Sequence, residues 1–284
     1  MSSFILYING LQGYKTLIGL IGKTYDIEVV LPLNIDNNAT LDLCSKHDIT
    51  VHSRTKDIPL DVGRKFDFLV SSAFPYFIYP SECELARNEA LNIHAAILPA
   101  YKGVHSGIWA LINGEETLGV TLHRISEKFD DGDVLRIKTF PVDDDMSLNI
   151  IRLKLFSLVI DVIDDFLNDG VATEKNDVST KSVYWRRRVK EDSQINWHCN
   201  SRSIFYFVRA LSRDPLYAFS QYNSNEYIFK KIVEVENNNI VELLAGEVVV
   251  EGEDIYIGCG QFDVIQVIDY EFSAKKLQTG MVLH

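Results

Sequence analysis

The first half of the chain alternates short apolar runs with stretches of helix-like spacing. FILYI, IEVVLPL and ITVH are apolar runs of strand length, and GYKTLIGLIGK and ATLDLCSKHD lie between them. A further apolar run, DFLVSS, follows. Because strands that alternate with helices form βαβ units, this rhythm predicts a largely parallel sheet. The fold class that follows is α/β.

The pattern continues to the middle of the chain and then changes. It predicts a helix near Pro80 to Asn88, the run LNIHAAIL, and strands in TLGVTLHRI and DVLRIKTFPV. From Leu148 to Leu167, apolar residues recur at helical spacing, which predicts a long amphipathic helix that ends near Gly170. The polar stretch GVATEKNDVSTKS comes next, so we place a domain boundary there, with a first domain at 1–180 and a second at 181–284.

The second domain is expected to be smaller and mainly β. A helical stretch, SRSIFYFVRALS, is followed by the strand-like runs EYIFKKIVEV, GEVVVEG, DIYIGCG and DVIQVIDYEF. The alternating runs VVVEG and DIYIGCG would leave open sheet edges in an isolated chain. A homodimer that covers such edges is therefore predicted.

Composition excludes several classes of function. The 284 residues carry a formal net charge of -12, so the surface should repel polyanions, and long nucleic acids are not expected as partners. The four cysteines are scattered without CxxC pairing, which indicates neither a zinc site nor a redox motif. No apolar run approaches bilayer length and the N-terminus lacks the features of a secretory signal, so we expect a cytoplasmic protein without membrane contact.

Asn92 and His94 are the first candidates for chemistry. They stand two apart in a strand-like run, so their side chains should project from one face. The run ends at Pro99, which places the pair near the carboxyl end of its strand, where open α/β sheets bind ligands. The later segment VTLHRISEKFDDGDVL adds His123 on a strand and Asp130 in a loop. Each residue alone is typical of a core histidine or a solvated turn, and their combination favours an acid–base site.

These residues belong to a pattern that resembles the folate-dependent formyltransferases. The pieces are Asn92-x-His94, LP-x-YKG from Leu98, NGE from Asn113, GVTLH from Gly119, and FDDGD, in that order. The resemblance implies a Rossmann-like N-terminal catalytic domain and 10-formyltetrahydrofolate as the formyl donor. The stretch YWRRRVKEDSQINW with SIFYFVRALSRDPLYAFS is similar to the link between domains in sugar N-formyltransferases. It implies an acceptor amine on a nucleotide-linked sugar.

The resemblance also implies roles for the three catalytic candidates. Asn92 would hydrogen-bond the formyl oxygen, and His94 would stabilise the tetrahedral intermediate and exchange protons. Asp130 would orient His94 and help to accept the amine proton. These roles suit the reaction, because attack of an amine on a formyl carbon builds negative charge on oxygen and positive charge on nitrogen. No metal is needed, and no cluster of metal ligands is visible in the sequence.

Further site residues are implied by position. Predicted folate contacts are Tyr76, Phe77, Ile78, Leu98, Ser126, Glu127, Lys128, Phe129 and Asp133. Predicted contacts to the sugar nucleotide are Lys102, His123, Trp185, Arg186, Arg187, Arg188, Tyr217 and Tyr222. Arginine forks suit a pyrophosphate, although a solvated strand edge is an equally ordinary interpretation. The aromatic rings suit a nucleobase, although aromatic residues more often belong to the core. Val104 departs from the pattern, because it offers no charge where relatives can carry arginine.

The first substrate hypothesis is dTDP-4-amino-4,6-dideoxyglucose, for surface polysaccharide (O-antigen, lipopolysaccharide) biosynthesis, with UDP- and GDP-sugars left open. The main alternative is a methionyl-tRNA formyltransferase. From Lys181 onward, however, 12 Lys plus Arg residues face 14 Asp plus Glu, which is not the basic surface that tRNA binding requires. A glycinamide-ribonucleotide enzyme would not need the long second domain. A folate or nucleotide-sugar binding module without turnover is the non-enzyme alternative.

Overall fold

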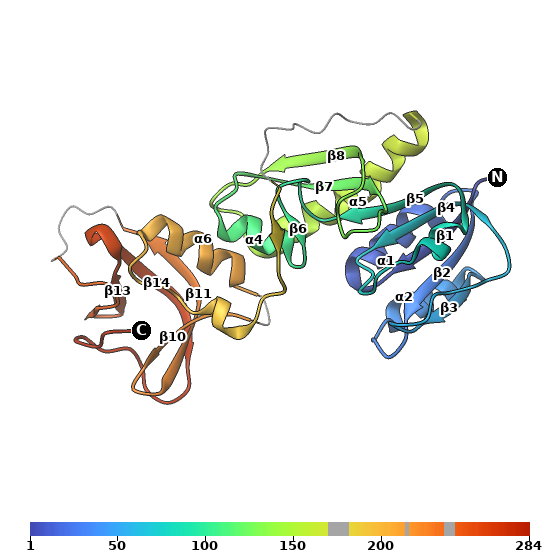
Figure 1. The fold of residues 1–284 in the computed structure, drawn as a ribbon. Coiled ribbons are helices and arrows are strands. Elements are labelled where there is room, and N and C mark those ends of the chain that lie inside the picture. The colour runs from blue at the N-terminus through green and yellow to red at the C-terminus, as the bar shows by residue number, and fades with distance from the viewer. Residues whose placement is uncertain (170–181, 214–215, 236–241) are drawn as a thin grey trace. The chain divides into compact units, whose positions relative to one another are not determined.

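The computed structural model describes residues 1–169, 182–213, 216–235 and 242–284, which form two compact units. The first unit comprises Met1–Ser106, Thr117–Pro141 and Arg152–Trp185. The second comprises Gly107–Glu116, Val142–Ile151 and Arg186–His284. The domain boundary predicted between residues 180 and 181 and the helix end predicted at Gly170 lie outside the described residues. Figure 1 shows the elements of both units.

The first unit is built on a seven-stranded sheet. Its strands are β1 (Ser3–Ile8), β2 (Asp26–Pro32), β3 (Thr50–Arg54), β4 (Phe66–Ser72), β5 (Ala86–His94), β7 (Thr117–Arg124) and β8 (Val134–Pro141). They lie in the order β3-β2-β1-β4-β5-β7-β8, and the pairs from β3 to β5 are parallel. β7 is antiparallel to both of its neighbours. The chain proceeds from β1 towards β3 on one side and from β4 towards β8 on the other, so the order reverses between β1 and β4.

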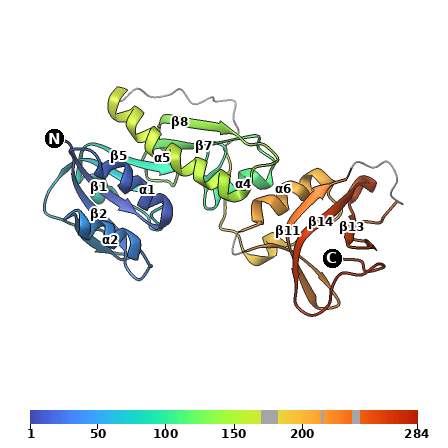
Figure 2. The same ribbon diagram turned by 180° about the vertical axis from the view of Figure 1, so that it is seen from behind.

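Helices cover this sheet because their apolar residues recur at helical spacing. They are α1 (Gly10–Ile21), α2 (Asn38–Lys46), α3 (Pro80–Cys83) and α5 (Leu148–Asp169). Leu17 and Leu20 of α1 are buried, and α1 and α5 lie on the same face of the sheet in Figure 2. They approach so closely that a Cβ added at Gly19 would lie 2.8 Å from the side chain of Ile160. The predicted alternation of strands and helices is therefore confirmed in the first unit.

One predicted element is wrong in part. The helix expected near Pro80 to Asn88 is the single turn α3, which ends at Cys83, and residues from Ala86 onward already belong to β5. Pairing of β5 with β4 decides the conformation here, since it satisfies backbone groups that a longer helix would withhold from the sheet.

The second unit contains a five-stranded antiparallel sheet. Its strands are β10 (Ala218–Tyr222), β11 (Asn225–Glu234), β12 (Val248–Glu251), β13 (Asp254–Gly258) and β14 (Val264–Phe272), in the order β10-β11-β14-β13-β12. The helices are α4 (Ser106–Ile112), which begins in the first unit, and α6 (Ser201–Leu211), with 3-10 turns at Lys190–Ser193 and Gly260–Phe262. The Asn200 side chain caps α6 by accepting the Ser203 N–H. An α/β unit and a mainly β unit confirm the predicted fold class, although β10 was not predicted.

The last residues of the chain cover both edges of the second sheet. The Met281 carbonyl accepts the N–H of Val248 in β12, and the Leu283 N–H donates to Gly246 just before that strand. The His284 backbone exchanges two hydrogen bonds of 2.9 Å with Gln221 of β10. The run DIYIGCG forms β13, which lies inside the sheet. The open edges on which the homodimer prediction rested are therefore absent at these strands in the part of the chain that the structure describes, and the homodimer itself stays a prediction.

A short parallel pair completes the first unit. Lys102–Gly103 forms β6 and pairs with Tyr184–Trp185, which forms β9. β6 follows β5 in the sequence, and its pairing with β9 brings it together with residues that follow the 170–181 segment. Among the described residues, we find no helix with the length and apolar character of a membrane span.

Candidate active site

Four polar side chains meet where β5 ends. Asn92 and His94 project from β5, and the antiparallel pairing with β7 sets His123 opposite Asn92. Asp130 reaches the same place from the loop between β7 and β8. The Asn92 Nδ2 atom lies 3.0 Å from His123 Nε2 and 3.4 Å from Asp130 Oδ1. The same Oδ1 lies 3.4 Å from His94 Nδ1 and 3.5 Å from His123 Nε2. The predicted catalytic residues therefore form one cluster.

His94 is buried, and its ring is held by the backbone. Its Nε2 atom lies 2.6 Å from the carbonyl oxygen of Tyr101. Because a carbonyl only accepts, Nε2 carries the proton of the neutral ring and Nδ1 is left facing Asp130. Burial lowers the pKa of His94, and the opposing effect of the Asp130 charge does not restore it to the ordinary value of 6.5. The imidazole is thus neutral at neutral pH, and a proton that reaches Nδ1 is stabilised by the adjacent carboxylate.

His123 fixes the orientation of Asn92. The His123 Nδ1 atom lies 2.8 Å from the carbonyl oxygen of Arg124, so Nδ1 donates and Nε2 accepts. The Asn92 amide N–H is the donor to that Nε2. The carboxamide therefore turns its nitrogen towards the cluster, which is the orientation that a hydrogen-bond donor to a developing oxyanion requires.

Asp130 is held in an unusual backbone conformation. Its φ is 52°, in the left-handed region that asparagine and aspartate tolerate better than most residues. The Oδ2 atom accepts the Gly103 N–H at 2.8 Å. Burial raises the pKa of this carboxyl, but the interactions with His123 and His94 and the hydrogen bond from the Gly103 N–H outweigh burial, and the pKa is lowered. Asp130 is therefore ionised beside a neutral imidazole.

Two glycines explain why the sequence folds in this way around the cluster. Gly103 has a φ of 95°, and a Cβ there would lie 2.3 Å from the carbonyl oxygen of Trp185. A Cβ at Gly132 would lie 1.9 Å from the carbonyl oxygen of Arg124. Both positions require glycine, because larger residues would collide with backbone that the strands hold in place. The glycines of the LP-x-YKG and FDDGD motifs thus shape the loops that present Asp130.

Further contacts secure the Asp130 loop. The buried Lys102 forms an ion pair with Asp131, and its ammonium lies 5.4 Å from the centre of the Tyr184 ring. The Tyr184 hydroxyl donates to the carbonyl oxygen of Phe129 at 2.6 Å. Trp185, predicted to contact the sugar nucleotide, stacks on Tyr101 with ring centres 5.8 Å apart and planes inclined by 12°. Asp131 and Tyr184 were not predicted, and no local sequence pattern indicates them.

The predicted folate residues come from two segments that meet. The rings of Phe77 and Phe129 lie 5.3 Å apart in an edge-to-face arrangement. Phe129 is 59% exposed, so this aromatic surface is free to pack against a flat ligand ring. Tyr76 is half-buried beside the guanidinium of Arg54, whereas Ile78 is buried in a core cluster with Tyr7. Core packing thus accounts for the Ile78 side chain.

The remaining predicted folate residues lie near the same loop. Leu98 is buried, and its N–H donates to Thr121. The Ser126 hydroxyl donates to the carbonyl oxygen of Lys128 at 2.9 Å, and Glu127 and Lys128 are exposed. Asp133 is exposed and pairs with Arg124 at 3.0 Å. These contacts describe the protein alone, and the folate contacts themselves stay predictions.

A buried ion pair holds the segment that contains Tyr76 and Phe77. Arg54 and Glu82 pair at 2.7 Å, and their side chains are 1% and 0% exposed. Arg54 also donates to the carbonyl oxygen of Phe77 at 2.6 Å, and Glu82 accepts from Leu60 and Tyr79 backbone N–H groups. Each charge is therefore hydrogen-bonded as well as paired, as a buried pair requires. No local pattern in the sequence indicates this pair.

The predicted sugar-nucleotide residues of the second unit have contacts of their own. The Arg186 guanidinium holds both carboxylate oxygens of Asp192, at 2.6 and 2.7 Å. Arg187 is exposed, whereas Arg188 is buried and donates to Ser193. The Lys230 ammonium lies 5.7 Å from the centre of the Tyr217 ring, and Tyr222 lines a pocket described below. Their role in substrate binding stays a prediction.

The cluster can carry out acid–base chemistry at a carbonyl-type carbon. It combines a neutral imidazole, an ionised carboxylate and an oriented carboxamide, so it offers a proton acceptor and a donor for a developing oxyanion. In the described part of the chain, no group of three or more His, Cys, Asp and Glu side chains is arranged to hold a metal ion.

Comparison with known families agrees with this arrangement. The N-terminal domain of the formyl transferase family matches residues 38–156, and its C-terminal domain matches residues 188–283. The chain belongs to the formyltransferase family. The predicted family is thus confirmed, and the clustered Asn92, His94 and Asp130 fall within the first match.

Named relatives add detail to this assignment. The formyltransferase is 29% identical over 208 residues to a methionyl-tRNA formyltransferase of Clostridium acetobutylicum, a match that covers 71% of this chain and 64% of that protein. The chain therefore spans just under two thirds of the length of that relative.

Two solved structures match over almost their whole length. WlaRD, a sugar 3N-formyl transferase determined in the presence of dTDP and 5-N-formyl-THF, has a TM-score of 0.73 at 21% identity and covers 97% of this chain and 99% of its own. An N-formyltransferase from Helicobacter canadensis, in complex with folinic acid and dTDP-3-aminofucose, has a TM-score of 0.70 at 19% identity and covers 94% and 98%. At these identities the likeness shows a shared fold.

Proposed function

We propose that this formyltransferase moves a formyl group from 10-formyltetrahydrofolate to the amino group of a nucleotide-linked amino sugar. The observation that carries the proposal is the convergence of Asn92, His94 and Asp130 at the carboxyl end of β5. The folate supplies an activated formyl carbon bonded to nitrogen. The exposed ring of Phe129 beside Phe77 fits the flat ring of such a donor.

The side chains divide the work in one transition state. The Asn92 N–H that faces Asp130 in the unliganded protein donates instead to the formyl oxygen as negative charge builds there. His94 takes the proton of the attacking amine at Nδ1, where the Asp130 carboxylate stabilises it, and returns it to the departing folate nitrogen. One carbon–nitrogen bond forms and one breaks, and the proton lost by the amine ends on the leaving group. The burial of His94 limits the access of competing water to its ring.

Two observations favour a sugar nucleotide over tRNA as the acceptor. The residues from Lys181 onward are net acidic, which disfavours a tRNA backbone. Two structures that match nearly the full length of both chains are named as a sugar 3N-formyl transferase and an N-formyltransferase, and the second is in complex with dTDP-3-aminofucose. Our first substrate remains dTDP-4-amino-4,6-dideoxyglucose in surface polysaccharide biosynthesis, in the cytoplasm. The Helicobacter complex makes 3-amino sugars the first alternative.

A direct assay tests the acceptor class. Purified protein with 10-formyltetrahydrofolate should add one formyl mass to a dTDP-linked 4-amino or 3-amino sugar, as read by mass spectrometry. Parallel reactions with UDP- and GDP-amino sugars define the base, and reactions with charged initiator tRNA test the alternative. Formylation of the tRNA alone would overturn the proposed substrate class.

The predicted homodimer needs a separate measurement. Sedimentation equilibrium should show twice the mass of the 284-residue chain. A mass of one chain at every concentration would overturn the dimer and would leave the acceptor assay unaffected.

A further inference from the structure

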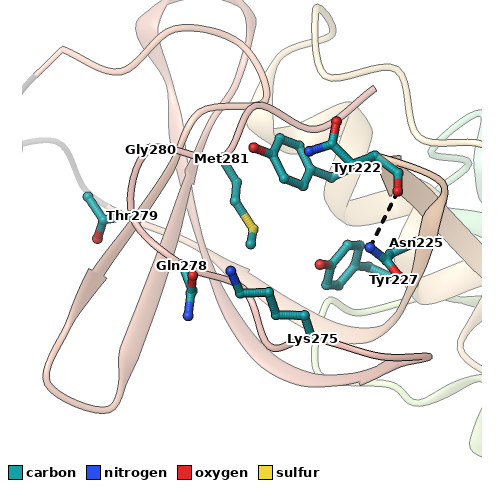
Figure 3. A pocket seen from close by; sticks show the side chains of 9 residues that line it. Tyr222, Asn225, Tyr227, Lys275, Gln278, Thr279, Gly280 and Met281 are labelled. Atoms are coloured by element: carbon teal, nitrogen blue, oxygen red, sulfur yellow. Dashed lines mark hydrogen bonds between the residues drawn. The ribbon is translucent and has the colours of Figure 1, made fainter.

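A pocket of about 260 Å³ opens beside the β10–β11 hairpin. Figure 3 shows how the hairpin residues Tyr222, Asn225 and Tyr227 face a segment that contains Lys275 and Met281. We call this cavity the hairpin pocket. All of its lining residues belong to the second unit, and none is a member of the cluster at the end of β5.

The floor of the hairpin pocket contains a buried phenol that lacks a partner. Tyr227 is 0% exposed, and among the described residues its hydroxyl makes no hydrogen bond. This is unusual for a buried hydroxyl, which ordinarily finds a donor or acceptor. The nearby indole of Trp197, for example, donates to Ser220 at 2.9 Å. Burial raises the pKa of Tyr227, so the hydroxyl keeps its proton and is available as a donor.

The walls of the hairpin pocket indicate the charge of a ligand. Lys275 supplies a cation, and Asn225 and Gln278 supply carboxamides that can donate and accept. None of the lining residues is Asp or Glu, so the wall is cationic in a protein whose net charge is -12. A lysine ammonium is a common partner of phosphate groups. The chemistry therefore suits an anionic ligand that also carries several hydrogen-bonding groups.

The size of the hairpin pocket suits one ring of such a ligand. Its volume is about 260 Å³. This space fits one monosaccharide or one base, with the charged group at the mouth beside the exposed Lys275. The Tyr222 ring at the wall offers a flat surface for either.

We propose that the hairpin pocket binds a phosphate monoester that places one polar ring in the pocket, either the base of a nucleoside 5′-monophosphate or the sugar of a sugar 1-phosphate. The ring occupies the pocket and accepts a hydrogen bond from the Tyr227 hydroxyl, while Lys275 pairs with the phosphate. The inference uses only residues of the second unit and does not rest on formyl transfer.

Calorimetry on the full chain tests the role of Lys275. The probes are dTMP and glucose 1-phosphate, each compared with thymidine or glucose, which lack the phosphate. We expect one phosphorylated probe to bind at least tenfold more tightly than its parent. Lys275→Gln should weaken that binding about tenfold or more, because a charged hydrogen bond is lost. Lys276→Gln removes the same charge one residue away, outside the pocket lining, and should leave the affinity unchanged.

Tyr227→Phe separates a binding role from a structural one. Since the hydroxyl has no partner in the described structure, its removal should leave the unfolding temperature of the unliganded protein unchanged or raise it. Affinity for the bound probe should nevertheless fall about fivefold, as expected for one neutral hydrogen bond. Loss of stability in this variant would show that the hydroxyl already had a partner and would overturn the proposal.

Two further results would also overturn it. One is the absence of binding by either phosphorylated probe at millimolar concentration. The other is binding that neither Lys275→Gln nor Tyr227→Phe weakens, which would place the probe elsewhere, for example at the predicted sugar-nucleotide site. Because the measurement uses no folate and no turnover, its failure is distinguishable from failure of the proposed formyl transfer.

Discussion

The cluster at the end of β5 and the hairpin pocket differ in how their buried polar groups are satisfied. In the first unit, Asn92, His94, His123 and Asp130 bond to one another and to backbone groups. In the second, the equally buried Tyr227 hydroxyl has no partner among the described residues. A site for chemistry must hold its groups in place before substrate arrives, whereas a binding pocket can leave a donor for its ligand. Single changes should therefore damage turnover in the first unit and affinity in the second.

The largest effect is expected at His94. Replacement by asparagine removes the proton acceptor and should lower turnover about 10²-fold to 10⁴-fold. Steady-state formyl transfer measures this loss, and binding of the nucleotide alone should change little. The matched control is His47→Asn, an exposed histidine in the same unit. Equal losses in both variants would show that the His94 effect is not chemical.

A somewhat smaller loss is expected at Asn92. Replacement by alanine removes one donor to the developing oxyanion and should cost roughly 10²-fold to 10³-fold in kcat. Asn88→Ala changes an exposed asparagine of the same strand and should have little effect on kcat. An Asn92→Ala enzyme with unchanged kcat and a raised KM would assign Asn92 to ground-state binding instead.

Gly103 tests whether the loop geometry itself matters. Alanine there meets a φ of 95° and the Trp185 carbonyl, so the variant should lose at least about 1–3 kcal/mol of unfolding free energy. Turnover should fall as well, because the Gly103 N–H holds Asp130. Gly22→Ala is the control, since its Cβ would meet nothing within 4 Å. Thermal unfolding of both variants measures the difference. Equal stability of the two variants would contradict the requirement for glycine at position 103.

The smallest effect is a shift in the titration of His94. Its pKa is lowered by burial and partly restored by the Asp130 charge, so Asp130→Asn should lower it further. Because the pKa of His94 is lower in the folded protein than in the unfolded chain, the folded protein binds fewer protons at His94 below about pH 6.5. His94 therefore reduces the free energy of unfolding as the pH falls below about 6.5. Proton NMR of the imidazole ring checks the direction. A higher pKa in the Asp130→Asn variant would contradict the pairing.

Much of the first unit could be predicted because its signals are local. Asn92 and His94 stand two residues apart in a strand, and a strand places such residues on one face. The glycines of the loop motifs can also be read directly from the sequence. By contrast, the groups that hold the cluster are a carbonyl of Tyr101 and an N–H of Gly103, and every residue has these groups. The sequence therefore does not indicate which backbone groups make these contacts.

Long-range pairs were missed for a different reason. Tyr184 reaches Phe129 from 55 positions away, and Arg54 of β3 reaches Glu82 of α3 from 28 positions away, so neither pair leaves a short spacing to recognise. Arg186 shows the reverse case. From the sequence we predict that the Arg186 guanidinium contacts a pyrophosphate. In the structure this guanidinium hydrogen-bonds the carboxylate of Asp192, six residues later. The hairpin pocket was likewise invisible, because strand β10 had no clear pattern and the chain end that helps to line it lies far along the sequence.

The account depends most on Asp130 acting through His94, which a double-mutant cycle measures directly. Formyl-transfer rates are compared for wild type, His94→Asn, Asp130→Asn and the double variant. The two atoms that face each other, His94 Nδ1 and Asp130 Oδ1, lie 3.4 Å apart, so we predict strong non-additivity. The double variant should lose little more activity than His94→Asn alone. A loss equal to the product of the two single losses would show that the residues act independently and would contradict the account.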